Sequence, residues 1–95
     1  MADAAEFLEL TDEERRFVEM KVALAAGLRG RREHQGLTQV ALARRLGSSQ
    51  SRIAKMEAAD RTVSLDLLVR ALLALGVTRD ELARLIRLSD RVRAA

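Results

Sequence analysis

Five serine or threonine residues each stand directly before a stretch in which apolar residues recur at helical spacing. At such a position the hydroxyl oxygen accepts a hydrogen bond from a backbone N–H of the first turn, so the residue marks the start of a helix. Glycine just after such a stretch adopts the left-handed conformation that ends a helix. The starts are Thr11, Thr38, Ser49, Ser64 and Thr78, and the ends are Gly36, Gly47 and Gly76. This pattern of starts and ends predicts five helices.

The predicted helices are long at the N-terminus and short in the middle of the chain. Their extents are Thr11 to Gly36, Thr38 to Leu46, Gln50 to about Ala58, Leu65 to Leu75, and Thr78 through Ile86. In the first helix Phe17, Met20, Leu24 and Leu28 recur at helical spacing. The composition agrees, because 48% of the residues are hydrophobic, only 2% are aromatic and none is proline. We predict an all-α fold, a compact five-helix bundle.

The side chains that support catalysis or metal binding are scarce. The chain has no cysteine, and His34 is its single histidine, so we expect no disulfide, no metal site and no cofactor. His34 lies at the expected end of a helix, where a solvent-facing histidine is ordinary. No phosphate-binding glycine loop, serine nucleophile motif or catalytic carboxylate pair is present. We therefore predict that the protein is not an enzyme.

No apolar run approaches the roughly 18 residues of a membrane span, and the first residues lack the basic segment of a secretory signal. We expect a cytoplasmic protein with no membrane partner. The net charge of +3 is unevenly distributed, with −5 over residues 1–19, +6 over residues 20–61 and +2 over residues 62–95. A basic centre is typical of proteins that bind a polyanion, although a solvated basic face gives the same pattern.

The second and third predicted helices are too short to be stable alone and are separated by a tight glycine turn. This is the arrangement of a helix-turn-helix, in which one helix braces against the phosphate backbone and the next enters the major groove. The segment from Leu37 to Glu57, LTQVALARRLGSSQSRIAKME, resembles the phage repressor/Cro-type (XRE) helix-turn-helix family. Leu-Thr-Gln, Leu-Ala-x-x-Leu-Gly, Ser-Gln-Ser-x-Ile and a terminal glutamate occur together in register, and the resemblance covers about residues 22–86.

The resemblance implies a lambda-repressor-like DNA-binding domain and assigns roles to individual side chains. It implies that Gln50, Ser51, Arg52 and Lys55 face the base edges of double-stranded DNA, and that Gln39 touches a phosphate. We expect further phosphate contacts from Ser49, Arg29, Arg31 and Arg32. The resemblance also implies that Arg32 pairs with Glu57 at the end of the third helix. Ala59 stands where the family usually has a glycine.

We divide the chain into an acidic arm with the start of the first helix (1–21), the helix-turn-helix domain (22–86) and a basic tail (87–95). The expected function is a sequence-specific transcriptional regulator, with repression favoured over activation, that binds a palindromic operator as a homodimer. The expected dimer contact is formed by Leu82, Leu85, Ile86 and Leu88, with the N-terminal arm as the alternative. The acidic approach Phe7-Leu-Glu-Leu-Thr resembles HigA-like antitoxins and small operon autorepressors. This resemblance makes a toxin protein the alternative partner.

Overall fold

The computed structural model describes the backbone of residues 10–94 and the side chains of residues 10–90. The described residues form five helices and no strand. The helices are α2 (Asp12–His34), α3 (Gln39–Leu46), α4 (Gln50–Glu57), α5 (Leu65–Ala74) and α6 (Arg79–Ala94). The predicted all-α bundle is therefore confirmed. The acidic arm expected at the N-terminus lies largely outside the described residues, and residues 87–94, expected as a basic tail, continue α6.

All five predicted hydroxyl caps are formed. Each oxygen accepts a hydrogen bond of 3.0–3.1 Å from the backbone N–H three residues further along the chain, as between Thr38 and Ala41 or Ser49 and Arg52. At the last cap the Glu81 carboxylate also accepts from the backbone N–H of Thr78, and the two bonds together form a capping box. These local bonds fix where each helix begins.

The predicted glycine stops adopt the left-handed conformation, with φ of +71° at Gly36, +65° at Gly47 and +83° at Gly76. The end of α4 is different, because Ala59 takes this role at φ +53°. A Cβ atom disfavours the left-handed region, so Ala59, which follows the C-cap residue Ala58, is strained. The strain coincides with the position at which the family usually has glycine.

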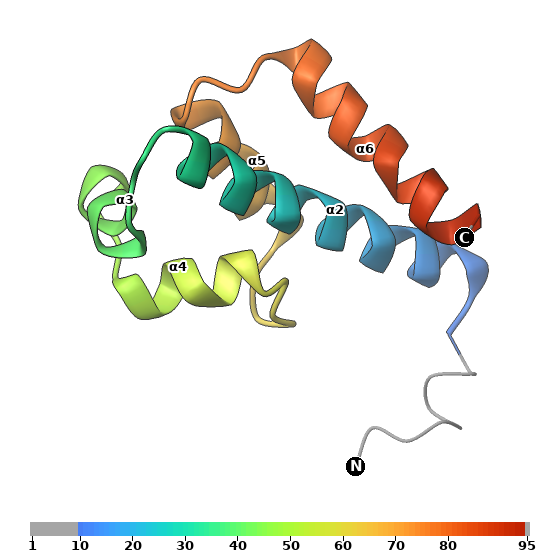
Figure 1. Cartoon of the computed structure of the whole chain (residues 1–95). Coiled ribbons are helices and arrows are strands. Elements are labelled where there is room, and N and C mark those ends of the chain that lie inside the picture. Colours follow the sequence, from blue (N-terminus) through green and yellow to red (C-terminus); the bar gives the residue numbers. More distant parts are fainter. Residues whose placement is uncertain (1–9, 95) are drawn as a thin grey trace.

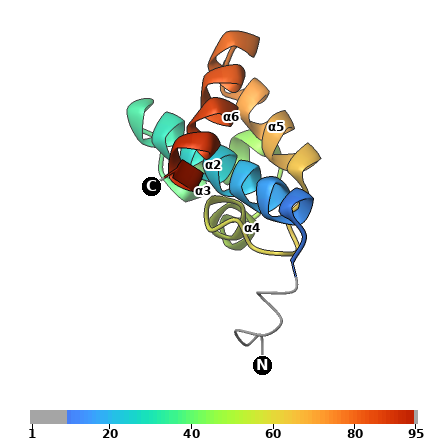
Figure 2. The same ribbon diagram turned by 90° about the vertical axis from the view of Figure 1, so that its right-hand side faces the viewer.

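The long helix α2 is the centre of the arrangement. In Figures 1 and 2, α6 lies along one side of α2, α3 and α4 lie on the other side, and α5 packs against the C-terminal half of α2. A Cβ atom on Gly27 would lie 2.6 Å from Leu85 Cδ1, so the absence of a side chain permits the close approach of α2 and α6. At Gly30 nothing from a neighbouring element lies within 4 Å of the same position, so this glycine is not required by close packing.

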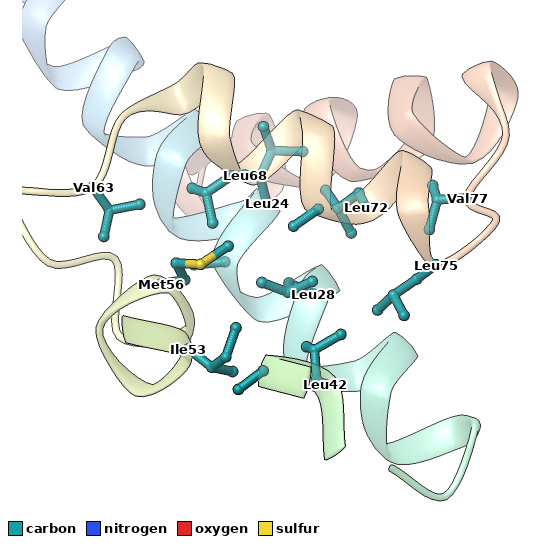
Figure 3. Packing of buried hydrophobic residues seen from close by; sticks show 13 residues of the cluster. Leu24, Leu28, Leu42, Ile53, Met56, Val63, Leu68, Leu72, Leu75 and Val77 are labelled. Atoms are coloured by element: carbon teal, nitrogen blue, oxygen red, sulfur yellow. The ribbon is translucent and has the colours of Figure 1, made fainter. Parts of the chain in front are cut away.

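The core joins all the helices around α2. Figure 3 shows the side chains of Leu28, Leu42 and Ile53, each 0% exposed, converging from α2, α3 and α4. Leu68 and Leu72 of α5 close the core from the other side. The predicted stripe on α2 is buried only in its second half, because Phe17 is 49% exposed. Phe17 lies on the N-terminal turns of α2, which extend past α5 in Figure 1.

Candidate nucleic-acid interface

The helices α3 and α4 are short, and their packing rather than their own stability holds them in place. Leu42 and Ala43 of α3, and Ile53 and Met56 of α4, are buried in the core. The turn between the two helices is closed by the backbone N–H of Ser48, which donates to the carbonyl of Ala43 at 2.8 Å. The relative position of the two helices is thereby fixed.

The face of α4 that points away from the core is polar and exposed. Burial of Ile53 and Met56 turns the side of the helix that carries Ser51 and Lys55 away from the core, while Gln50 and Arg52 are exposed in the first turn, at the edges of that side. The exposed side chains are Gln50, Ser51, Arg52 and Lys55, the four residues expected to face base edges. The structure therefore brings this predicted set together, exposed, on one helix.

Arg32 of α2 and Glu57 at the end of α4 form a bidentate ion pair. Arg32 Nε donates to Glu57 Oε2 at 2.5 Å and Nη2 donates to Oε1 at 3.0 Å. The two side chains are 11% and 5% exposed. Arg32 Nη1 also donates to the carbonyl of Leu37 at 2.8 Å, between α2 and α3. One guanidinium therefore joins α2, α4 and the start of α3.

The electrostatics of this pair favour the charged forms. Burial of Glu57 opposes its ionisation, but hydrogen bonds from Arg32 and Gln39 outweigh burial and hold the pKa of Glu57 below its ordinary value. The hydrogen bond to Glu57 correspondingly raises the pKa of Arg32. The pair is therefore ionised at neutral pH.

Gln39 connects this ion pair to the exposed face of α4. Its Nε2 donates to Glu57 Oε1 at 3.1 Å, and its Oε1 accepts from Gln50 Nε2 at 2.7 Å. A continuous chain of hydrogen bonds therefore leads from Arg32 through Glu57 and Gln39 to Gln50. The Gln50 amide is oriented by the interior of the protein, although the residue itself is exposed.

The loop after α4 adds residues that the sequence reasoning missed. Thr62 lines a shallow hollow of about 260 Å³ together with Ser49, Ser51, Arg52 and Lys55. The Asp60 carboxylate accepts from the backbone N–H of Thr62 at 2.9 Å and from its hydroxyl at 2.6 Å. These bonds hold the pKa of Asp60 below its usual value. The Asp-x-Thr pattern of an Asx turn is the signal that could have indicated this loop.

Comparison with protein families identifies the constellation. A family model described as helix-turn-helix matches residues 28–90. The chain belongs to this family, the XRE helix-turn-helix family. The match supports a DNA-binding transcriptional regulator. The comparison with curated proteins and the comparison with solved structures gave no match.

Family membership gives α4 its usual name, the recognition helix, and the other predicted residues are placed relative to it. Ser49 is the N-cap of the recognition helix. Arg29 is exposed on α2 and pairs with Glu33 at 3.4 Å. Arg31 lies apart from these residues, because its guanidinium donates to Glu81 Oε2 at 3.0 Å and to the carbonyl of Gly76 at 3.1 Å.

The four leucine and isoleucine residues expected at a dimer contact divide into two pairs. Leu82 and Leu85 are partly buried and pack against the core of the helix-turn-helix domain. Ile86 is 38% exposed and Leu88 is 43% exposed.

In the part of the chain that the structure describes, no helix is long and apolar enough to cross a membrane, and no group of histidine and acidic side chains could hold a metal ion.

Proposed function

We propose that this protein is a repressor that binds a palindromic operator as a homodimer and distinguishes base sequences through its recognition helix. The single observation that carries the proposal is the hydrogen-bond chain that ends at Gln50. The hydrogen bonds from the buried ion pair orient the exposed Gln50 amide in the free protein, before DNA binds. Such preorganisation reduces the entropy lost on binding.

The donors and acceptors left free on the recognition helix match base edges. Gln50 uses one Nε2 hydrogen on Gln39, so its second hydrogen and its Oε1 remain available. These are the two groups that pair with N7 and N6 of adenine in the major groove. Arg52 and Lys55 can donate to O6 and N7 of guanine, and the Ser51 hydroxyl can contact either kind of base.

Phosphate contacts would hold the recognition helix in register. The Ser49 hydroxyl accepts from the backbone N–H of Arg52 and retains its own hydrogen for a phosphate oxygen. Gln39 retains one Nε2 hydrogen, and the Arg29 guanidinium is exposed. We assign these three residues to phosphates. Arg31 and Arg32, expected at phosphates from the sequence, are given a supporting role because their guanidinium groups bind internal partners.

A second copy of the chain would double the number of base pairs that are contacted. Two recognition helices related by a two-fold axis bind two half-sites about 34 Å apart. The exposed side chains of Ile86 and Leu88 on α6 support a dimer contact there. Leu73 of α5 is 49% exposed and serves as the matched control. Sedimentation should show that Ile86→Glu or Leu88→Glu converts a dimer to a monomer, whereas Leu73→Glu does not.

Selection from a pool of randomised DNA duplexes tests the proposed function directly. The wild-type protein should enrich one sequence with two-fold symmetry, and a reporter under that sequence should be silenced when the protein is expressed. Enrichment of no sequence would contradict specific DNA binding. Enrichment of a single asymmetric half-site would contradict the palindromic dimer, and activation of the reporter would contradict repression.

A second candidate function is that of an antitoxin that neutralises a toxin protein and represses its own operon. It is favoured by the exposed apolar side chains of Phe17, Val18 and Val22, which lie on the part of α2 that precedes the family match. An apolar patch of this kind is suited to contact with another protein. A toxin encoded beside this gene that forms a stoichiometric complex with the wild-type protein, but not with Val18→Asp, would support this function.

A further inference from the structure

Lys21 is a buried charged residue that the DNA-binding chemistry above does not use. It lies on α2, before the residues that match the helix-turn-helix family, and is 9% exposed. Burial of an ammonium group is unfavourable unless the group is hydrogen-bonded. Its Nζ donates to the backbone carbonyl of Asp60 at 2.9 Å. Lys21 is therefore directed at the loop that follows the recognition helix, 39 residues away in the chain.

The Asp60 carbonyl that Lys21 binds accepts two hydrogen bonds. Asp60 O also accepts the backbone N–H of Val63 at 3.0 Å, so one oxygen closes the turn and receives the ammonium. The backbone N–H of Asp60 donates to the carbonyl of Lys55 at 3.0 Å. This bond ties the loop to a residue of the recognition helix that we place at a base. Movement of Asp60 would be passed directly to the end of that helix.

The loop needs an external support because its own conformation is strained. Ala59, the residue before Asp60, has φ +53°, which an alanine adopts only at a cost in free energy. The Asx turn from Asp60 to Thr62 stabilises the far side of the loop. Val63 and Ala59 pack the loop against the core, and the Lys21 bond adds a hydrogen bond between the loop and α2.

We propose that Lys21 is a positioning residue, which holds the Asp60 carbonyl and thereby sets the C-terminal end of the recognition helix for DNA. This inference rests on the proposed function. It means that the N-terminal half of α2, outside the family match, adjusts DNA affinity without touching DNA. Because Lys21 is buried, it acts through Asp60 and forms no phosphate contact.

The test compares Lys21→Met with Arg16→Met in the full chain. Both variants remove one positive charge from the N-terminal half of α2, but the Arg16 side chain is exposed, so long-range electrostatic effects are matched. Binding to the duplex selected by the wild-type protein is measured over a series of salt concentrations, at a temperature at which all variants are folded. Amide hydrogen exchange of residues 59–63 is measured without DNA.

Lys21→Met should bind the selected duplex roughly tenfold more weakly than Arg16→Met, the effect of losing one hydrogen bond to a charged group. The slope of log affinity against log salt should stay that of Arg16→Met, and the amides of residues 59–63 should exchange faster. Lys21→Arg, which keeps a donor, should bind more tightly than Lys21→Met. If Lys21→Met does not fold, Lys21→Ala replaces it, because alanine removes the donor and adds no polar group to this buried position.

Three results would each overturn the proposal. Equal affinities of Lys21→Met and Arg16→Met would show that the bond to Asp60 has no effect on DNA binding. A salt slope that falls by about one for Lys21→Met alone would make Lys21 a phosphate contact. Failure of the wild-type protein to select any duplex is a separate outcome, which refutes the proposed function and this inference with it. Unchanged exchange in Lys21→Met would refute the role of Lys21 in holding the loop, whatever the DNA result.

Discussion

The ion pair between Arg32 and Glu57 gives the largest single effect on stability that we expect from one substitution. Arg32→Met keeps the aliphatic volume of the side chain and removes three donors. Glu57 loses both of its bonds to the guanidinium and keeps only the bond from Gln39, while the carbonyl of Leu37 loses its donor. A carboxylate whose side chain is 5% exposed is then left without a counter-charge.

The magnitude follows from this burial. Removing one partner of a buried ion pair typically costs about 3–5 kcal/mol. We expect about 3 kcal/mol, the lower end of that range, because Gln39 still donates to Glu57. For a domain of this size each kcal/mol shifts the melting temperature by about 4–8 °C, so Arg32→Met should melt roughly 12–24 °C below the wild type.

The assay is thermal unfolding followed by circular dichroism at neutral pH, with Arg70→Met as the matched control. Arg70 pairs with Asp66 at 3.0 Å, but both side chains are about three-quarters exposed, at 76% and 75%. Loss of this surface pair should cost no more than about 0.5 kcal/mol. If Arg32→Met melted within about 4 °C of Arg70→Met, the argument that burial makes the Arg32 pair essential would be refuted.

Two further substitutions follow from the same region. Ala59→Gly should raise stability by about 1 kcal/mol, measured by urea unfolding, because it relieves the left-handed strain at φ +53°. The control Ala58→Gly, at φ −88°, should lower it. Glu57→Gln should be less stable than the wild type at pH 7. The difference should shrink as pH falls below 4.5 through the lowered pKa of the folded state, because protonation of Glu57 removes the same charge. A pH-independent difference would contradict the role of the Glu57 charge.

Helix positions were predictable because they depend on local bonds. A hydroxyl such as Thr38 Oγ1 needs only the amide three residues away, and a glycine such as Gly47 needs only its own conformational freedom. On the recognition helix, the burial of Ile53 and Met56 determines that Ser51 and Lys55 face outward, and Gln50 and Arg52 are exposed in the first turn. The register of the helix-turn-helix could therefore be obtained from the sequence.

Contacts between distant segments could not be obtained in this way. Lys21 reaches Asp60 across 39 residues, and no local pattern records that pairing. Arg31 resembled its neighbours in the basic segment, but the packing of α5 and α6 directs it to Glu81 and Gly76. Phe17 continues an apolar stripe and yet is 49% exposed, because the core ends before the stripe does. In each case tertiary packing decides, and it is set by residues far away in the chain.

The central claim is that the exposed face of the recognition helix distinguishes base sequences, and one measurement tests it most directly. Affinities for the selected duplex and for a scrambled duplex are compared across salt concentrations for Gln50→Ala, Lys55→Ala and Arg29→Ala. Gln50→Ala and Lys55→Ala should each reduce the difference between the two binding free energies by about 1–3 kcal/mol. Arg29→Ala should weaken both affinities equally and lower the salt slope by about one per contact. Equal losses of both affinities in Gln50→Ala and Lys55→Ala would show that this face does not distinguish bases.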